Sequence, residues 1–318
     1  MSAAVPLAQI RAARERIAGS VLRTPLVRLV LDDAPAEIWL KLENLQPIGS
    51  FKLRGASNAI ALAPPERLAK GVWTASAGNM AQGVAWQARR LGLPCTVVAP
   101  DHAPEAKLAA IRRLGAAIVQ LPFADWFQIL ETGRHPGMEG LFVHPVSDEA
   151  VMAGNGTIGL EILEELERVD SILVPYGGGG LSCGIASAAR GLGVPTRVFA
   201  CEVETAAPVA ASFAAGGPAR VSYTASFVDG IGSPFVLSGM WERARELLAG
   251  SLVVTLRQVA DAVRLLVERH RVVAEGAGAA SLAAALTGKE RGRVVCVISG
   301  GNLDPARLAR ILEGGIPD

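Results

Sequence analysis

A lysine follows a predicted turn and stands at the start of a predicted helix. Pro47 and Gly49 favour the turn, and Lys52 comes directly after it, between Phe51 and Leu53. Most lysines are solvated surface charges. Burial, however, can lower the pKa of a lysine from about 10.4 to about 6. A buried Lys52 would therefore be an amine nucleophile that can form a Schiff base.

A run of glycines follows a predicted buried strand. The four residues are Gly177, Gly178, Gly179 and Gly180. Each glycine inside a helix costs about 1 kcal/mol relative to alanine, so the run is predicted to be a loop. Its exposed N–H groups can hold a phosphate at the N-terminus of a helix that we expect to begin near Ser182.

Nucleotide binding is an alternative for the same loop. The glycine run does not match GxGxxG in any register, because the sixth position is Ser182 or Cys183. Glu202 nevertheless lies about where a dinucleotide-binding fold places its ribose-binding acid. A nucleotide-dependent oxidoreductase therefore remains open at this stage, as does a non-catalytic ligand-binding module.

Two further loops follow predicted strands. In Ser76-Ala77-Gly78-Asn79, the asparagine is either a helix N-cap or an amide aimed at an anionic ligand. Ser299 ends a strand and precedes two glycines. Ligands of open α/β sheets bind beyond the carboxyl ends of the strands, so Ser299 could offer a hydroxyl to a ligand, although a simple strand-exit turn is the alternative.

Short apolar runs alternate with helical patterns, which predicts an α/β fold with right-handed crossovers. The predicted strands are Ile38–Leu42, Gly71–Thr74, Thr96–Ala99, Ala117–Leu121, Ser171–Pro175, Arg197–Cys201 and Arg293–Ile298. Thr255 and Gln258 form a capping box before a further helix. The segment Ala206–Ser226 is the longest predicted connection, and no clear linker separates domains.

The composition excludes several classes of partner. The 318 residues are 50% hydrophobic and carry a net charge of +1, which gives no electrostatic reason to bind nucleic acid or an anionic membrane. No apolar stretch is long enough to span a bilayer. The four cysteines are scattered, and charged residues occupy the N-terminus, so we expect a reducing cytoplasm without disulfides.

Taken together and in this order, these segments resemble the serine/threonine dehydratase group of fold-type-II pyridoxal-phosphate enzymes. The resemblance runs from about Arg23 to Asp304 and includes Lys41-Leu42-Glu43-Asn44, Ala153-Gly154-Asn155-Gly156-Thr157 and Glu275-Gly276-Ala277-Gly278. It implies two open, twisted, mostly parallel sheets with helices on both faces. A large domain would comprise residues 1–70 and 148–318, and a small domain residues 71–147.

The resemblance also implies pyridoxal phosphate as cofactor, with Lys52 as the catalytic residue that holds it covalently. Phe51 would lie against the pyridine ring, Asn79 would meet the ring hydroxyl, and Ser299 the ring nitrogen. The implied cofactor-binding residues are Phe51, Lys52, Asn79, Gly177, Gly178, Gly179, Gly180, Leu181, Glu275 and Ser299. The implied substrate-binding residues are Ser76, Ala77, Gly78, Asn79, Met80 and Ser233.

The implied activity is elimination of water and ammonia from a β-hydroxy L-amino acid to give a 2-oxo acid. Serine racemases carry a second serine where this chain has Ala77, so racemisation is disfavoured. Met80 stands where the family usually has histidine. With Trp126 and Phe127, it indicates a bulkier substrate than threonine, unless it is a neutral change at a packing position.

Other reactions on the same scaffold, such as serine racemisation and β-replacement, are the remaining enzymatic alternatives. Some relatives bind a divalent cation. Here Glu202 and Ala206 could supply two ligands, but Pro208 replaces the second acid, so we expect no metal. By analogy with the family we expect a homodimer whose ligand is a small amino acid.

Overall fold

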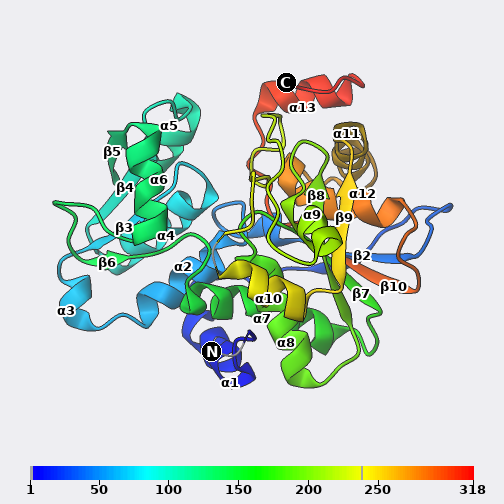
Figure 1. The fold of residues 1–318 in the computed structure, drawn as a ribbon, viewed down its shortest axis with the longest axis horizontal. Helices are drawn as coiled ribbons and strands as arrows, with labels where there is room; N and C mark the ends of the chain where they lie inside the picture. The colour runs from blue at the N-terminus through cyan, green and yellow to red at the C-terminus, as the bar shows by residue number, and fades with distance from the viewer. Residues whose placement is uncertain (1–2, 238) are drawn as a thin grey trace.

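The computed structural model describes residues 3–237 and 239–318, and its strands form two separate sheets (Figure 1). The six-stranded sheet has the order β1-β2-β10-β7-β8-β9. Its strands are β1 Leu26–Arg28, β2 Glu37–Lys41, β7 Ser171–Pro175, β8 Arg197–Val203, β9 Gly250–Val254 and β10 Arg293–Val297. The four-stranded sheet has the order β5-β4-β3-β6. Its strands are β3 Val72–Ala75, β4 Cys95–Pro100, β5 Ala117–Leu121 and β6 Leu141–Phe142.

Among the described strands, every neighbouring pair is parallel apart from β1 and β2, which are antiparallel. The predicted fold of two mostly parallel sheets is therefore confirmed. The helices are α1 Leu7–Ile17, α2 Lys52–Ala61, α3 Pro65–Leu68, α4 Asn79–Leu91, α5 Glu105–Arg113, α6 Phe123–Thr132, α7 Glu149–Glu165, α8 Gly180–Leu192, α9 Pro208–Ala215, α10 Met240–Leu247, α11 Leu256–Leu265, α12 Gly276–Leu286 and α13 Pro305–Leu312. None of the helices in residues 3–237 and 239–318 is both long and apolar enough to cross a membrane.

The predicted boundaries hold to different degrees. β5 and β7 occupy the predicted residues, whereas β2 begins and ends one residue earlier. The short edge strand β1, the two-residue β6 and the glycine-initiated β9 were not predicted. The segment Ala206–Ser226 is not one long connection, because it contains α9. The helix after the glycine run begins at Gly180 rather than near Ser182.

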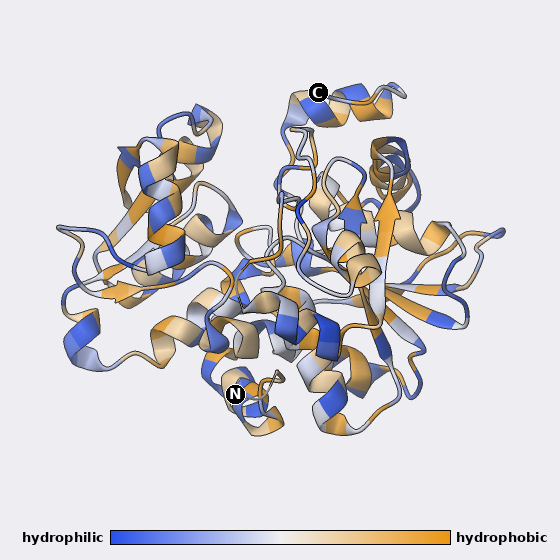
Figure 2. Cartoon of the chain, viewed as in Figure 1, coloured by the Kyte–Doolittle hydropathy of each residue, from blue (hydrophilic) through white to orange (hydrophobic). Residues whose placement is uncertain are grey.

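Helices cover both faces of the six-stranded sheet because its strands are apolar on both faces. On β10, Val294 and Cys296 pack into one buried cluster while Val295 and Val297 pack into another. This division follows the two-residue period of a strand. Figure 2 shows the result, with β9 orange along most of its length and helices such as α13 alternating between blue and orange.

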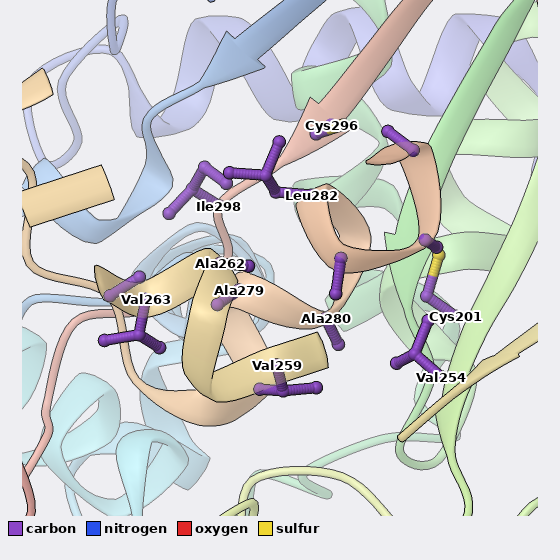
Figure 3. Packing of buried hydrophobic residues seen from close by; sticks show 14 of the residues in the cluster. Cys201, Val254, Val259, Ala262, Val263, Ala279, Ala280, Leu282, Cys296 and Ile298 are labelled. Carbon is purple, nitrogen blue, oxygen red and sulfur yellow. The ribbon is translucent and has the colours of Figure 1, made fainter. Parts of the chain in front are cut away.

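One of these clusters shows how small side chains set the helix–sheet distance. Ala280 of α12 lies on the side of Cys201 of β8, and Ala279 lies on the side of Ala262 and Val263 of α11 (Figure 3). α12 is built almost entirely from alanine and glycine. Its backbone can therefore lie close to the sheet, which leaves room for the larger residues of α11 behind it.

Glycines hold α7 tightly against α2 and α8. A Cβ atom on Gly154 of α7 would lie 2.5 Å from the carbonyl oxygen of Arg54, and one on Gly184 of α8 would lie 2.5 Å from that of Met152. Real side chains cannot approach a backbone so closely. α2 begins with Lys52 and α8 follows the glycine loop, so this packing fixes the distance between those two features.

A buried charge network connects β2, α2 and α7. Arg54 donates to both carboxylate oxygens of Glu43 at 2.8 Å, and to those of Glu161 at 2.6 and 2.9 Å. Lys41 contacts Glu161 at 2.6 Å and the carbonyl of Thr24 at 2.6 Å. The four charged side chains are at most 5% exposed, and their formal charges cancel. Burial alone would raise the pKa of Glu43, but Arg54 overcomes this and holds that pKa below its usual range.

Replacement of Arg54 should destabilise the fold strongly. In Arg54→Met the stem remains, but Glu43 and Glu161 lose their shared partner, and an unpaired buried charge costs about 3–5 kcal/mol. Arg14→Met is the matched control, since Arg14 pairs with Glu164 of the same α7 at a site where both side chains are more than a third exposed. That change should cost no more than about 1 kcal/mol. Urea unfolding measures both changes. An equal loss of unfolding free energy in the two variants would contradict the proposal that the buried network stabilises the fold more than the surface pair does.

Candidate active site

A cavity of about 330 Å³, which we call the central cavity, is lined by residues from both sheets. Several of them follow directly on strands: Ser76 comes after β3, Gly177 after β7 and Ser299 after β10. The predicted site residues that line it are Phe51, Lys52, Ser76, Ala77, Gly78, Asn79, Met80, Gly177, Gly178, Gly179, Gly180, Leu181, Glu275 and Ser299. The strand ends of the two sheets thus meet at one site, as expected for open α/β sheets.

Lys52 is the first residue of α2 and its amine faces the central cavity. Nζ donates a hydrogen bond to the carbonyl oxygen of Pro145 at 2.8 Å and lies 5.2 Å from the centroid of the Phe51 ring. Burial lowers the pKa of Lys52 to about 8, although the nearby Glu275 opposes that change. A much larger share of this amine is therefore neutral near pH 7 than for a solvated lysine.

The glycine loop leads into α8 without a side-chain cap. Gly179 is the N-cap residue, with φ at +93°, and offers no side chain to the first helical turn. The N–H groups of that turn therefore face the cavity as donors. A Cβ atom on Gly178 would lie 2.3 Å from Cγ1 of Val146, and one on Gly180 would lie 2.5 Å from the Val146 carbonyl oxygen. Only glycine fits at these two positions.

A chain of amides and a carboxylic acid spans the other side of the cavity. Asn302 donates to Oδ1 of Asn79 at 2.8 Å and to the carbonyl of Ile48 at 2.9 Å. Because its oxygen is occupied, Asn79 presents its NH₂ group as a donor, and it donates to Glu275 at 2.9 Å. Burial, together with repulsion from Asp229, raises the pKa of Glu275 to about 7, while the bond from Asn79 opposes this.

Ser299 and Met80 occupy buried positions in the wall. Ser299 is 3% exposed, and its carbonyl accepts the N–H of Phe51 at 3.0 Å, which joins β10 to the turn before Lys52. Met80 is 2% exposed and packs in the apolar core of the smaller sheet. Trp126 also lines the central cavity, with its indole N–H bonded to the carbonyl of Val98 at 3.2 Å.

Two residues considered in the sequence lie elsewhere. Ser233 is not among the lining residues of the central cavity, and its hydroxyl donates to the carbonyl of Phe235 at 2.8 Å. Glu202 is 2% exposed and accepts the N–H groups of Val209 and Ala210 at the start of α9. Its carboxylate thus caps the first turn of α9 in the interior, and Glu202 is not among the residues that line the central cavity.

Some residues that line the central cavity were not predicted from the sequence. Pro145 and Val146 line the central cavity, as do Lys107 and Asp229, whose side chains pair at 3.0 Å. Pro145 and Val146 follow the unpredicted β6, and Asp229 precedes Gly230 and Gly232, but neither segment was recognised as part of the site. Asn302 ends the motif Ser299-Gly300-Gly301-Asn302, but no role was predicted for it. The structure shows that its side chain orients Asn79.

The raised pKa of Glu275 predicts a pH-dependent effect on stability. In the unfolded chain Glu275 ionises near pH 4.5, whereas in the folded chain it keeps its proton until about pH 7. The wild-type protein therefore loses stability as the pH rises between these values, and Glu275→Gln does not. Urea unfolding measures this. Between about pH 5 and about pH 8, the free energy of unfolding of the variant should rise by roughly 2–3 kcal/mol relative to that of wild type. A difference that is independent of pH would contradict this pKa.

Comparison with known proteins identifies the family. The model of the family described as "pyridoxal-phosphate dependent enzyme" matches residues 17–300. The L-threonine ammonia-lyase of Geobacter sulfurreducens is 40% identical, over 98% of this chain and 79% of that protein. The catabolic L-threonine dehydratase of Staphylococcus aureus is 36% identical, over 98% and 93%. Maize serine racemase superposes with a TM-score of 0.87 at 32% identity, over 98% of both chains.

These matches confirm the predicted resemblance to the serine/threonine dehydratases and, with it, pyridoxal phosphate as the cofactor. The chain therefore belongs to the pyridoxal-phosphate-dependent enzyme family.

Proposed function

We propose that this protein is a pyridoxal-phosphate-dependent ammonia-lyase. It converts a β-hydroxy L-amino acid (serine, threonine or an analogue with a larger side chain) to a 2-oxo acid and ammonia by α,β-elimination. The observation that carries the proposal is the buried Lys52 amine, with a pKa of about 8, in the same cavity as an uncapped glycine loop. An amine nucleophile and a phosphate cradle are what this cofactor requires of its protein.

The residues of the central cavity fit the cofactor. The glycine loop and the first turn of α8, which includes Leu181, would hold the phosphate, because this helix start has no side-chain cap and its N–H groups can donate to an anion. Asn79 with Glu275 would meet the ring hydroxyl, Ser299 the ring nitrogen, and Phe51 one face of the ring. When bound, pyridoxal phosphate withdraws electrons from the α-carbon of the amino acid.

The protein's own groups would then orient the substrate and move the proton. The loop Ser76-Ala77-Gly78-Asn79 would bind the substrate carboxylate through its N–H groups and small polar side chains. Lys52, neutral in part near physiological pH, would take the proton from the α-carbon, and the ammonium so formed could pass that proton to the β-hydroxyl, which then leaves as water. The neutral Ser299 hydroxyl would avoid full protonation of the ring nitrogen, which favours elimination over transamination.

Loss of Lys52 should abolish both cofactor attachment and turnover. In Lys52→Ala the protein should lose its yellow colour, and kcat for serine or threonine should fall by at least roughly 10²–10⁴-fold, the usual contribution of a positioned base. Lys70→Ala is the matched control, since Lys70 is 59% exposed and pairs with Glu139 at the surface. Absorbance spectra and ammonia release give the two readings. A variant at Lys52 that stays yellow and active would overturn the proposal.

Ala77 separates elimination from racemisation. It lines the central cavity without a hydroxyl, so the α-carbon lacks a proton donor on the face opposite Lys52. The relatives named for threonine ammonia-lyase activity are more similar in sequence than maize serine racemase, which supports the same choice. Nucleotide binding is not supported, because Glu202, the acid that would bind a ribose, caps α9 instead.

Ala77→Ser should therefore raise the ratio of racemisation to ammonia release on L-serine. Wild-type protein should release ammonia faster than it forms D-serine. The added hydroxyl should increase D-serine formation by at least about 10-fold, which is less than the roughly 10²–10⁴-fold that an optimally positioned acid contributes. Chiral chromatography beside an ammonia assay measures both products. If wild type interconverts the serine enantiomers faster than it releases ammonia, elimination is not its main reaction.

We further propose the setting in which the enzyme works. All four cysteines are buried and free, which supports a reducing cytoplasm. The separate sheets support a small domain of residues 71–147 and a large domain formed by the rest. Exposed apolar side chains on the large domain, among them Val30 at 74% and Leu22 at 52%, support a homodimer.

A further inference from the structure

A second cavity of about 600 Å³, which we call the side cavity, adjoins the central cavity. It lies between α6 on one side and α10, with the loop before it, on the other (Figure 1). Pro145 and Val146 line both cavities and form the wall between them. None of the motifs in the sequence, and none of the roles given above to the central cavity, accounts for a space of this size.

The shared wall stands beside the reactive atom. The carbonyl oxygen of Pro145 accepts the hydrogen bond from the Lys52 amine at 2.8 Å. Val146 lies against the glycine loop, since a Cβ on Gly178 would meet its side chain. An amino acid held at Lys52 with its carboxylate at the loop Ser76-Ala77-Gly78-Asn79 would therefore lie beside this wall, in which Val146 is the branched side chain between the two cavities.

The side cavity is lined by aromatic rings and aliphatic side chains, together with the charged residues Glu131, Arg220 and Glu242. Phe127 and Phe235 meet edge to face with their centroids 6.3 Å apart, and Trp241 and Leu130 add further apolar surface. Arg220 stacks on Phe235 at 4.7 Å, which covers that ring with its own charge rather than leaving the guanidinium for a ligand. Such a surface binds flat apolar groups better than it binds the single methyl of threonine.

The wall carries no charge that would repel an apolar group. His144 precedes Pro145, and burial lowers its pKa below the usual value. Its Nε2 bonds to the carbonyl of Leu130 at 3.0 Å, and its Nδ1 accepts the N–H of Val146 at 3.0 Å. Accepting at one nitrogen and donating at the other requires the neutral imidazole. The wall is thus held in shape by a neutral residue.

We propose that the substrate class is a β-hydroxy amino acid whose β-carbon carries an aromatic group, which passes Val146 and binds in the side cavity. This inference rests on the proposed ammonia-lyase function and narrows its substrate. It also gives Trp126 and Phe127 distinct places, the former in the central cavity and the latter in the side cavity.

The test compares L-threo-β-phenylserine with L-threonine on the yellow holoenzyme. We expect kcat/KM for phenylserine to exceed that for threonine by at least about 10-fold, the discrimination that a pocket gains from one or more extra carbons. Leu130→Trp, which fills the side cavity from α6, should lower the ratio of the two values by at least about 10-fold. Leu91→Trp, at an exposed leucine of α4, should leave that ratio as it is.

A binding measurement on the wild-type protein does not depend on turnover or on whether Leu130→Trp folds. Spectral titration of wild-type holoenzyme should show tighter binding of L-phenylalanine than of L-alanine, since neither can lose a β-hydroxyl. Turnover of threonine with no turnover of phenylserine and no preference for L-phenylalanine overturns this inference alone. An equal loss for both substrates in Leu130→Trp, with the protein folded, also overturns it. Failure of Lys52 to hold the cofactor would instead overturn the proposed function.

Discussion

The pairing of Arg54 with two buried carboxylates is the constraint on which the site depends. Arg54 lies two residues after Lys52 in the first turn of α2, and it binds Glu43 from the end of β2 and Glu161 from α7. The direction in which α2 leaves its turn is thereby fixed from two sides. Because the glycines of α7 bring it against α8 as well, the Lys52 amine and the glycine loop are held by one continuous packing unit.

The ionisable residues on the two sides of α2 have different surroundings. Behind it, each of the buried residues Lys41, Arg54, Glu43 and Glu161 contacts a residue of opposite charge within 2.8 Å. In front of it, Lys52 and Glu275 at the central cavity have no ion-pair partner within contact distance in the part of the chain that the structure describes, and burial pushes each towards its neutral form. The pKa of Lys52 falls to about 8 and that of Glu275 rises to about 7. A neutral amine beside an acid that holds its proton near neutral pH suits proton transfer at an α-carbon.

The sequence predicted the features that depend on local chemistry. Continuous apolar runs located β5 and β7, the turn before Lys52 placed it at the start of α2, and the capping box of Thr255 and Gln258 opens α11. Features that depend on distant contacts could not be read in this way. Glu202 matched a ligand-binding position in the chain, but it caps α9, and Val146 carries no motif although it separates two cavities. Such roles come from segments that meet only after folding.

The proposed function requires that Lys52 holds the cofactor covalently, and chemical trapping tests this directly. The holoenzyme would be reduced with borohydride, digested and mapped by mass spectrometry. We expect the phosphopyridoxyl group on the peptide that contains Lys52 and on no other. Attachment to another lysine, such as Lys107 at the same cavity, or the absence of any attachment, would contradict it.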